Sequence, residues 1–139
     1  MRPKVKIVRD PILIDDVIGS VESPSAGCIV SFIGTVRNKS GLGMVTEMHL
    51  EAAEDLARKD IRRIAERAMS THELIGVAVT HRVGDLKVGE VIVVVAVSAA
   101  HRKDAFDACE YMIDELKKTT PIWKKERSGG RGQWVKRES

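Results

Sequence analysis

Cations dominate the residues of this sequence that could do chemistry, and they gather near the expected ends of one helix and just beyond it: His101, Arg102, Lys117, Lys124 and Lys125. Arginine holds phosphate or carboxylate through paired hydrogen bonds. A lysine that is crowded by other cations or partly removed from water has a lowered pKa, so it can act as a base or a nucleophile near neutral pH. Each charge taken alone is most simply a solvated surface residue. Their clustering instead indicates a site that handles anions, with Lys117 and Lys124 as the candidates for catalysis.

A helix that ends near Thr119 must position these cations. Apolar residues at a three-and-four spacing predict its buried stripe: Phe106, Cys109, Ile113 and Leu116. The residue before a proline is disfavoured in a helix, so Thr120 before Pro121 marks the stop. A helix of this length spans roughly 25 Å, from a rise of about 1.5 Å per residue. Its two ends therefore cannot line one small pocket within a single chain, which predicts a dimer or an extended groove.

The chain before this helix predicts alternating strands and helices, with strands over 5–8, 28–37 and 44–51 and helices over 12–21 and 52–69. Gly34 interrupts the strand 28–37 and predicts a bulge or a close backbone approach. We expect residues 44–51 to return as its partner strand after the loop 38–43. Residues 76–99 predict two antiparallel strands, in which His81 falls on an apolar face as a hydrogen-bonded core histidine.

The C-terminal part predicts a small hairpin subdomain from about residue 121, with a strand at 133–135 and with Trp123 and Trp134 paired across it. Short connections between neighbouring strands favour an antiparallel or mixed sheet with helices packed on it, which is an α+β fold. A chain of 139 residues can bury one sizeable core, so residues 1–139 are predicted to form a single domain.

The composition of the chain argues against several classes of protein. Lys and Arg number 23 against 20 Asp and Glu, and a net charge of +3 is too mild for a dedicated nucleic-acid binder. Cys28 and Cys109 occupy apolar-periodic positions, which predicts buried free thiols in a reducing compartment. The sequence has no signal-peptide pattern and no apolar run long enough to span a membrane, so a cytoplasmic location is expected. Its four histidines lack metal-ligand spacing, and neither a metal nor a cofactor is predicted.

The predicted helix 52–69 allows a different functional hypothesis. It is expected to bury one stripe, Leu56, Ala57, Ile61, Ile64 and Ala68, and to turn five cations outward, Arg58, Lys59, Arg62, Arg63 and Arg67. This basic face could bind RNA, but no aromatic side chains are interleaved to stack on bases, and acidic neighbours make a solvated surface the simpler interpretation. A second alternative is a non-catalytic α+β interaction module that binds an acidic or tail-bearing partner.

Four stretches together resemble the large (catalytic) subunit of molybdopterin synthase: FIGTVRN at 32–38, HRVGDLKVGE at 81–90, SAAHRKDAF at 98–106 and LKKTTPIWKKE at 116–126. The resemblance covers most of the chain from about residue 27 and implies a hammerhead-like α+β fold. It implies sulfur transfer to cyclic pyranopterin monophosphate, which forms the dithiolene of molybdopterin. The implied donor is a small ubiquitin-like subunit with a C-terminal Gly-Gly thiocarboxylate, and the implied assembly is a homodimer within a heterotetramer. Neither nucleic acid nor membrane is an implied partner.

The resemblance also assigns site residues. Lys117 matches the catalytic lysine, and Lys124 is the second catalytic candidate. Substrate binding is implied for the matching positions Thr35, Val36, Arg37, His101, Arg102, Lys117, Lys124, Lys125 and Glu126. The family often has lysine where this chain has Thr35. The assignment agrees with elementary electrostatics, because two anionic reactants about 4 Å apart repel each other by about 4 kcal/mol at an effective dielectric of 20. A cationic pocket offsets that repulsion.

Overall fold

A four-stranded mixed sheet forms the frame of the molecule, in the order β1-β6-β8-β2. The computed structural model describes residues 2–41, 43–128 and 131–135. The strands of this first sheet are β1 (Lys4–Val8), β2 (Cys28–Thr35), β6 (Gly76–Arg82) and β8 (Val91–Ala99). β1 runs parallel to β6, and the β6–β8 and β8–β2 pairs are antiparallel. The two strands predicted within residues 76–99 are thus confirmed.

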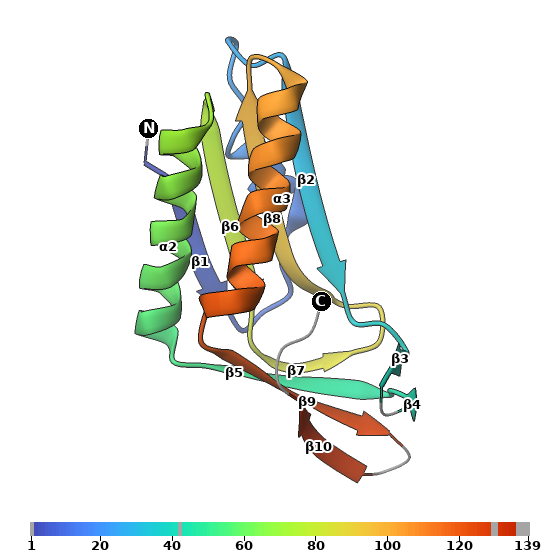
Figure 1. Ribbon diagram of the computed structural model, residues 1–139. Coiled ribbons are helices and arrows are strands. Elements are labelled where there is room, and N and C mark those ends of the chain that lie inside the picture. Colours follow the sequence, from blue (N-terminus) through green and yellow to red (C-terminus); the bar gives the residue numbers. More distant parts are fainter. Residues whose placement is uncertain (1, 42, 129–130, 136–139) are drawn as a thin grey trace.

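Helices cover both faces of the first sheet (Figure 1). α2 (Glu54–Thr71) and α3 (Arg102–Thr119) lie on one face, over a core that includes Val77, Val79, Val95 and Val97. The short α1 (Ile14–Gly19) packs on the alternate side chains, Ala78, Val94 and Ala96. Because both faces are covered, β6 and most of β8 are buried throughout, which explains the continuous apolar run of β8.

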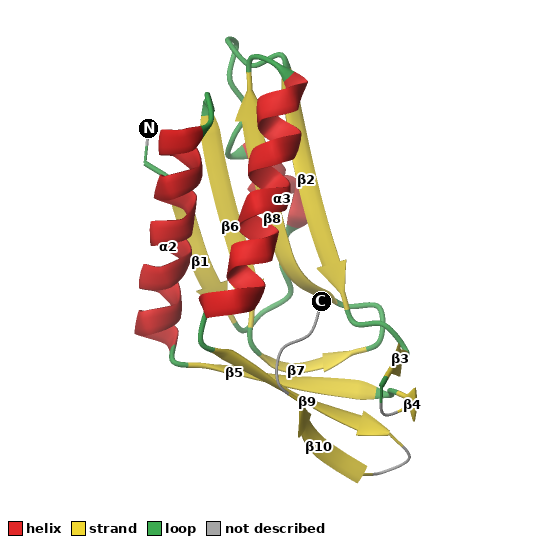
Figure 2. Cartoon of the chain, viewed as in Figure 1, coloured by secondary structure: helices red, strands yellow, loops and turns green. Residues whose placement is uncertain are grey.

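A second sheet, fully antiparallel, crosses one end of the first (Figure 2). Its order is β10-β9-β5-β7, formed by β5 (Glu47–Ala52), β7 (Gly84–Lys87), β9 (Ile122–Ser128) and β10 (Arg131–Val135). The alternate residues Met48 and Leu50 of β5 point into a core of their own with Leu86 and Ile122. The predicted C-terminal hairpin is the β9–β10 pair, and β9 joins it to this sheet. The fold is α+β, as predicted.

The prediction that residues 44–51 pair with the strand 28–37 is wrong. β2 pairs with β8 across its whole length, and β5 pairs with β7 and β9. In the described residues of the intervening loop, the two-residue strands β3 (Lys39–Ser40) and β4 (Gly43–Met44) pair with each other. Sequence proximity favoured a hairpin, but β2 finds an apolar, β-branched partner in β8, whereas the alternating β5 needs one buried face and one exposed face.

The buried stripes of the two long helices also differ from prediction at one residue each. Phe106 is 60% exposed and Leu56 is 63% exposed. In α3 the small residues Ala105 and Ala108 face the sheet beside Cys109, so the stripe is turned away from Phe106. In α2 the buried residues begin at Ala57. Alanines let a helix approach the sheet closely. A pattern built on large apolar side chains does not detect a buried stripe made of small ones.

The smaller predictions have mixed outcomes. α3 ends at Thr119 as predicted, since Thr120 is extended before Pro121. The bulge at Gly34 is confirmed by a register shift between Gly34 and Thr35. α1 is shorter than the predicted 12–21: it spans Ile14–Gly19, with Leu13 extended before it and Ser20 as its C-cap.

The tryptophans and cysteines follow prediction only in part. The backbone register sets Trp134 opposite Lys125, not Trp123; the Trp134 side chain lies outside the described residues. Cys28 and Cys109 are free thiols, but Cys28 is only half-buried, because β2 is at the sheet edge. Burial raises the pKa of the Cys109 thiol to about 11. In the part of the chain that is described, no helix combines the length and apolar character needed to cross a membrane.

Candidate functional site

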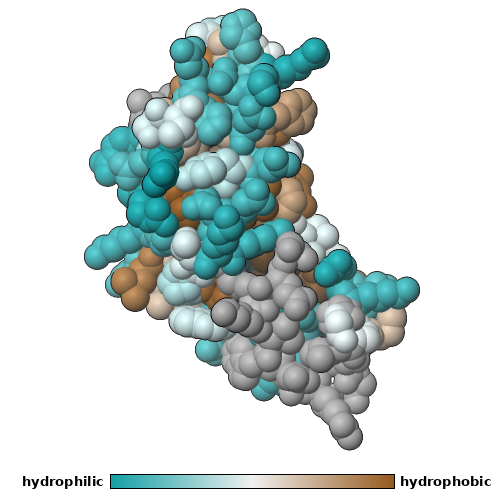
Figure 3. All heavy atoms as spheres, viewed as in Figure 1, coloured by the Kyte–Doolittle hydropathy of each residue, from teal (hydrophilic) through white to brown (hydrophobic). Residues whose placement is uncertain are grey.

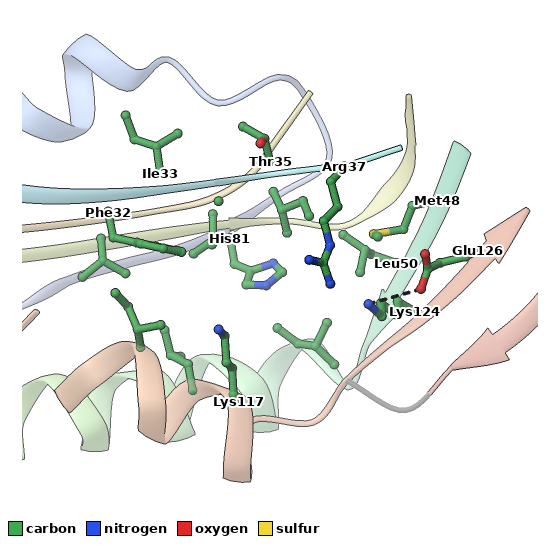
Figure 4. Close-up of a pocket in the computed structure, with 17 residues that line it drawn as sticks. Phe32, Ile33, Thr35, Arg37, Met48, Leu50, His81, Lys117, Lys124 and Glu126 are labelled. Atoms are coloured by element: carbon green, nitrogen blue, oxygen red, sulfur yellow. Dashed lines mark ion pairs between the residues drawn. The ribbon is translucent and has the colours of Figure 1, made fainter. Parts of the chain in front are cut away.

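A cavity of about 350 Å³ lies where the first sheet, the C-terminal end of α3 and the second sheet meet (Figure 4). Three cations and one carboxylate reach it from three parts of the chain: Arg37 from just beyond β2, Lys117 from α3, and Lys124 and Glu126 from β9. His81 and Thr35 add polar atoms to the wall. The remaining wall is mainly apolar, from Phe32, Ile33, Met48, Leu50, Ile92, Val93, Val95, Ile113, Leu116 and Ile122. A volume of this size suits a small ligand or the end of a peptide.

Lys117 reaches the cavity because α3 ends there. Leu116 is buried against the sheet, and the next residue therefore projects beside the sheet edge. Figure 4 shows the Lys117 side chain rising from the last turn of α3 toward the strands. Lys118 is different: its side chain is 71% exposed, its amine lies 3.5 Å from Glu115, and it does not line the cavity. Of the two adjacent lysines, only Lys117 is in position to act in this cavity.

Strand alternation decides which C-terminal residues face the cavity. Ile122, Lys124 and Glu126 are on the inner face of β9, whereas Lys125 falls on the outer face and does not line the cavity. Lys124 Nζ lies 3.2 Å from Glu126 Oε1, and the two side chains are only 15% and 3% exposed. A carboxylate buried this deeply is tolerated because a cation neutralises it. Glu126 therefore holds Lys124 at the cavity wall.

Arg37 and Thr35 come from the end of β2, on the opposite side of the cavity from Lys117 (Figure 4). Val36 lies between them and is buried in the second core, so its side chain is not part of the wall. Its backbone is fixed: Val36 N donates to Glu90 O at 3.0 Å, and Gly89 N donates to Val36 O at 2.8 Å. Val36 thus acts as the anchor that directs Arg37 into the cavity.

His101 and Arg102 do not reach this cavity within one chain. They are exposed at the N-terminal end of α3, and neither lines the wall. α3 has 18 residues, which corresponds to roughly 27 Å at 1.5 Å per residue. The predicted gathering of all the cations therefore holds for Arg37, Lys117 and Lys124, and the pair at the other end of α3 needs a second copy of the chain to take part.

His81 is the polar wall residue whose place in the site was not expected from sequence. The prediction of a hydrogen-bonded core histidine is confirmed, since His81 is 6% exposed and its Nδ1 lies 2.8 Å from the carbonyl oxygen of Arg82. It also borders the cavity. Alternation could not reveal this, because it places His81 on the apolar face of β6 with Val77 and Val79, and the whole strand is buried.

The basic face of α2 is largely committed to local contacts. Arg58 and Arg63 form ion pairs with Asp55 and Asp60 at 3.0 and 2.8 Å, and Arg62 donates to the carbonyl of Pro3. This arrangement does not favour the RNA-binding alternative, which needs cations available to phosphates.

Comparison with known proteins adds to this geometry. Residues 7–119 match the family model described as MoaE protein. The chain belongs to the MoaE family, the catalytic subunits of molybdopterin synthase. It is 37% identical over 136 residues to the molybdopterin synthase catalytic subunit of Pyrococcus abyssi, covering 96% of this chain and 92% of the relative. For the corresponding Thermoplasma volcanium protein the identity is 40% over 131 residues, with 94% and 96% covered.

Solved structures of MoaE proteins share the fold. Molybdopterin synthase from Staphylococcus aureus superposes with a TM-score of 0.88 at 32% identity, covering 93% of this chain and 94% of that one. A Helicobacter pylori 26695 structure, a protein–protein complex of subunits 1 and 2 of molybdopterin-converting factor, has the same fold, with a TM-score of 0.79 at 19% identity and coverage of 97% and 92%. As a MoaE protein the chain is a sulfurtransferase of molybdenum cofactor biosynthesis. The non-catalytic alternative is not supported.

Proposed function

We propose that the cavity between α3 and β9 is where sulfur moves from the C-terminal thiocarboxylate of a small ubiquitin-like carrier to cyclic pyranopterin monophosphate. The observation that carries this proposal is the convergence of Arg37, Lys117 and Lys124 on one cavity. The substrate carries a phosphate and the donor an anionic thiocarboxylate. Bringing them together costs Coulomb energy that cations close to both reactants offset.

Each cation has a separate role in this proposal. Arg37 binds the substrate's phosphate, since a guanidinium suits a phosphate's geometry. Lys117 acts at the donor's terminal carbonyl and at the attacked pterin carbon. Lys124 transfers protons, and Glu126 keeps its amine at the wall. Thr35 and Val36 form the strand end that faces the pterin, and Lys125, on the outer face of β9, has no role inside the cavity in this proposal.

The proposed donor is a small partner subunit whose tail enters the cavity. The Helicobacter pylori structure is a protein–protein complex of subunits 1 and 2 of molybdopterin-converting factor. An extended tail ending in two glycines suits a narrow site, because glycine lacks the side chain that would collide with the wall. We place the protein in the cytoplasm, where the free thiols Cys28 and Cys109 remain reduced.

We also propose that two copies pair along β2 and complete each other's sites. β2 lies at the edge of the first sheet, where β8 is its one neighbour among the described strands. Three large apolar side chains are exposed on β2 and on the helix that packs against it: Ile29 and Ile33 of β2 and Phe106 of α3. Hydrophobic colour collects along this side of the molecule in Figure 3. An exposed, apolar edge strand is a ready template for pairing with another chain.

Antiparallel pairing along this edge would bring the two ends of α3 together. β2 has eight residues, a length of roughly 27 Å that matches α3. Cys28 at its start pairs with Ala99, two residues before His101. In an antiparallel arrangement the Cys28 end of one copy lies beside the Thr35 end of the other. His101 and Arg102 of the second copy would then approach the cavity that Arg37 enters, and with one carrier at each end the assembly would be a heterotetramer.

The test is a reconstituted reaction. The protein is mixed with a thiocarboxylated carrier and cyclic pyranopterin monophosphate, and dithiolene formation is followed by mass spectrometry of the pterin. We expect two sulfur atoms in the product and none when the carrier ends in an ordinary carboxylate. Binding of the carrier without any sulfur in the pterin would contradict the proposal.

A further inference from the structure

The turn between β7 and β8, residues 88–90, fixes the backbone just before Arg37. Val36 N donates to Glu90 O at 3.0 Å, and Gly89 N donates to Val36 O at 2.8 Å. These two bonds continue the pairing of β2 with β8 beyond Thr35, where the register has already shifted. Arg37 follows directly and enters the cavity. The direction of Arg37 therefore depends on how firmly this turn is held.

The Glu90 side chain holds the turn together. Its Oε1 accepts a hydrogen bond from Lys87 N at 3.1 Å, and Glu90 N donates to Lys87 O at 3.0 Å, so the turn is closed by two bonds. Its Oε2 forms an ion pair with Arg82 Nη1. The hydrogen bond from Arg82, followed by the one from the Lys87 backbone, lowers the pKa of Glu90. The carboxylate is therefore charged at neutral pH and engaged at both oxygens.

Arg82 gives Glu90 a rigid partner. Its side chain is only 10% exposed, and its strand, β6, is buried along its whole length inside the first sheet. Arg82 Nε also donates to Arg9 O at 3.2 Å, which ties the guanidinium to the chain just after β1. Neither Arg82 nor Glu90 lines the cavity. Any effect of this ion pair on a ligand in the cavity must pass through Val36 and Arg37.

We propose that Arg82 and Glu90 are positioning residues for Arg37; this rests on the proposed function, in which Arg37 binds the substrate's phosphate. Their ion pair links the buried strand β6 to the turn, the turn holds Val36, and Val36 aims Arg37. A guanidinium binds phosphate through two parallel hydrogen bonds, so the contact depends on direction as well as on charge. Loosening the turn should weaken substrate binding without removing any group that touches the substrate.

The decisive experiment is a double-mutant cycle on pterin affinity, measured by calorimetric titration with cyclic pyranopterin monophosphate in the absence of carrier. Arg37→Ala should weaken binding roughly 10- to 100-fold, as loss of a charged hydrogen-bonding group does. Glu90→Gln should weaken it roughly 2- to 30-fold, the range for substitutions that act on a ligand from a distance. The double variant should bind no more weakly than Arg37→Ala, because Glu90 acts only through Arg37. Additive losses, or wild-type affinity in Glu90→Gln, would overturn the inference.

Glu54→Gln is the matched control. Glu54 also pairs with an arginine, Arg9, at 3.0 Å, and its side chain is 38% exposed, against 35% for Glu90. It lies at the start of α2 and does not line the cavity, so its replacement should leave pterin affinity unchanged. Equal losses of affinity in Glu54→Gln and Glu90→Gln would mean that loss of any such ion pair loosens the site, and the specific role of Glu90 would be wrong.

Amide hydrogen exchange tests the same link without a ligand. In Glu90→Gln the Val36 amide should exchange faster, whereas the Gly27 amide, which donates to Ala99 O at 2.9 Å at the other end of β2, should not change. Unchanged exchange at Val36, or equal acceleration at both amides, would contradict the inference. Arg82→Gln removes the same ion pair from the β6 side and should give the same exchange pattern and the same loss of affinity, so it carries the test if Glu90→Gln does not fold.

Arg37→Ala separates this inference from the proposed function. If that variant binds the pterin as tightly as the wild type, the phosphate-binding role of Arg37 fails and the positioning role fails with it. If Arg37→Ala weakens binding and the predictions for Glu90→Gln fail, the positioning role alone is wrong.

Discussion

The two ends of α3 carry similar residues in very different surroundings. At the N-terminal end His101 and Arg102 are exposed and do not line the cavity that Lys117 enters. At the C-terminal end Lys117 is half-buried and shares a cavity with Arg37 and Lys124. The difference is made by the second sheet, which crosses only that end of the helix (Figure 1). Cations at a helix end become a reaction site where another element closes over them, and remain surface charge where none does.

The largest effect in this comparison is expected from Lys117→Ala. Loss of the amine removes a charge aimed at the reacting atoms, so dithiolene formation should fall roughly 10²- to 10³-fold. Lys118→Ala is the matched control, because Lys118 is the adjacent lysine and pairs with Glu115 outside the cavity. Rapid-quench assays of both variants with thiocarboxylated carrier measure the effect. Equal losses in the two variants would show that the cavity does not distinguish them.

The exposed end of α3 should matter only through a second copy. Arg102→Ala is expected to lower activity roughly tenfold, as the loss of one charged contact worth about 1.4 kcal/mol would. Mixing it with Lys117→Ala under conditions of subunit exchange should regain activity, because a mixed dimer has one cavity with both residues intact. Random exchange would restore about a quarter of the sites in a twofold dimer. Mixtures no more active than the average of the two parents would mean that Arg102 does not act across an interface.

Asp60 of α2 holds the segment that connects Lys117 at the end of α3 with Lys124 of β9. Its carboxylate accepts from Thr119 and Thr120 at 2.8 and 2.7 Å and from Arg63 at 2.8 Å. Asp60→Asn should destabilise the protein by about 1–3 kcal/mol, because it weakens charge-assisted hydrogen bonds in a poorly exposed place. Asp55→Asn is the control, since Asp55 forms the same i,i+3 pair with Arg58 but is exposed. Urea unfolding compares the two, and equal effects would contradict this role.

The same residue predicts a pH dependence. Burial raises the pKa of Asp60, but hydrogen bonds from Arg63, Thr120 and Thr119 outweigh it and leave the pKa below its usual value. A carboxyl group with a lowered folded-state pKa stabilises the protein above its unfolded pKa and loses this contribution as pH falls through the folded value. The stability gap between wild type and Asp60→Asn should therefore shrink in acid. A stability difference between the two proteins that stays constant down to pH 2 would contradict a lowered pKa of Asp60.

The smallest effect is expected on the outer face of the second sheet. His49 Nδ1 lies 2.7 Å from Asp85 and Nε2 lies 3.0 Å from Glu51, and the hydrogen bond to Asp85 raises the pKa of His49. A group with a raised folded-state pKa stabilises the protein below its unfolded-state pKa, and this contribution is lost as pH rises through the folded-state pKa. His49→Gln should lower the free energy of unfolding by less than about 1 kcal/mol near pH 5, because exposed ion pairs contribute no more than that. At pH 9 the loss should be smaller still. Activity should not change, and a larger stability loss at pH 9 than at pH 5 would reverse the expected sign.

The sequence predicted the elements of this fold better than their partners. Helix α3 and its stop at Pro121 follow from local rules that act within a few residues, and so does the bulge at Gly34. The pairing of β5 with β9 joins residues far apart in sequence, and local turn signals pointed to β2 instead. The same limit applies to the site: the residue types of Arg37, Lys117 and Lys124 indicated anion chemistry, but their convergence depends on the second sheet. His81 was assigned to the core because it falls on the apolar face of its strand, and the sequence did not show that a cavity borders that face.

A crystal structure of the protein with cyclic pyranopterin monophosphate would show whether the cavity is the reaction site. We expect pterin density within the cavity beside Lys117, with the phosphate held by Arg37 and by His101 and Arg102 of a second copy paired along β2. Substrate bound elsewhere, with Lys117 and Lys124 facing an unoccupied cavity, would contradict it.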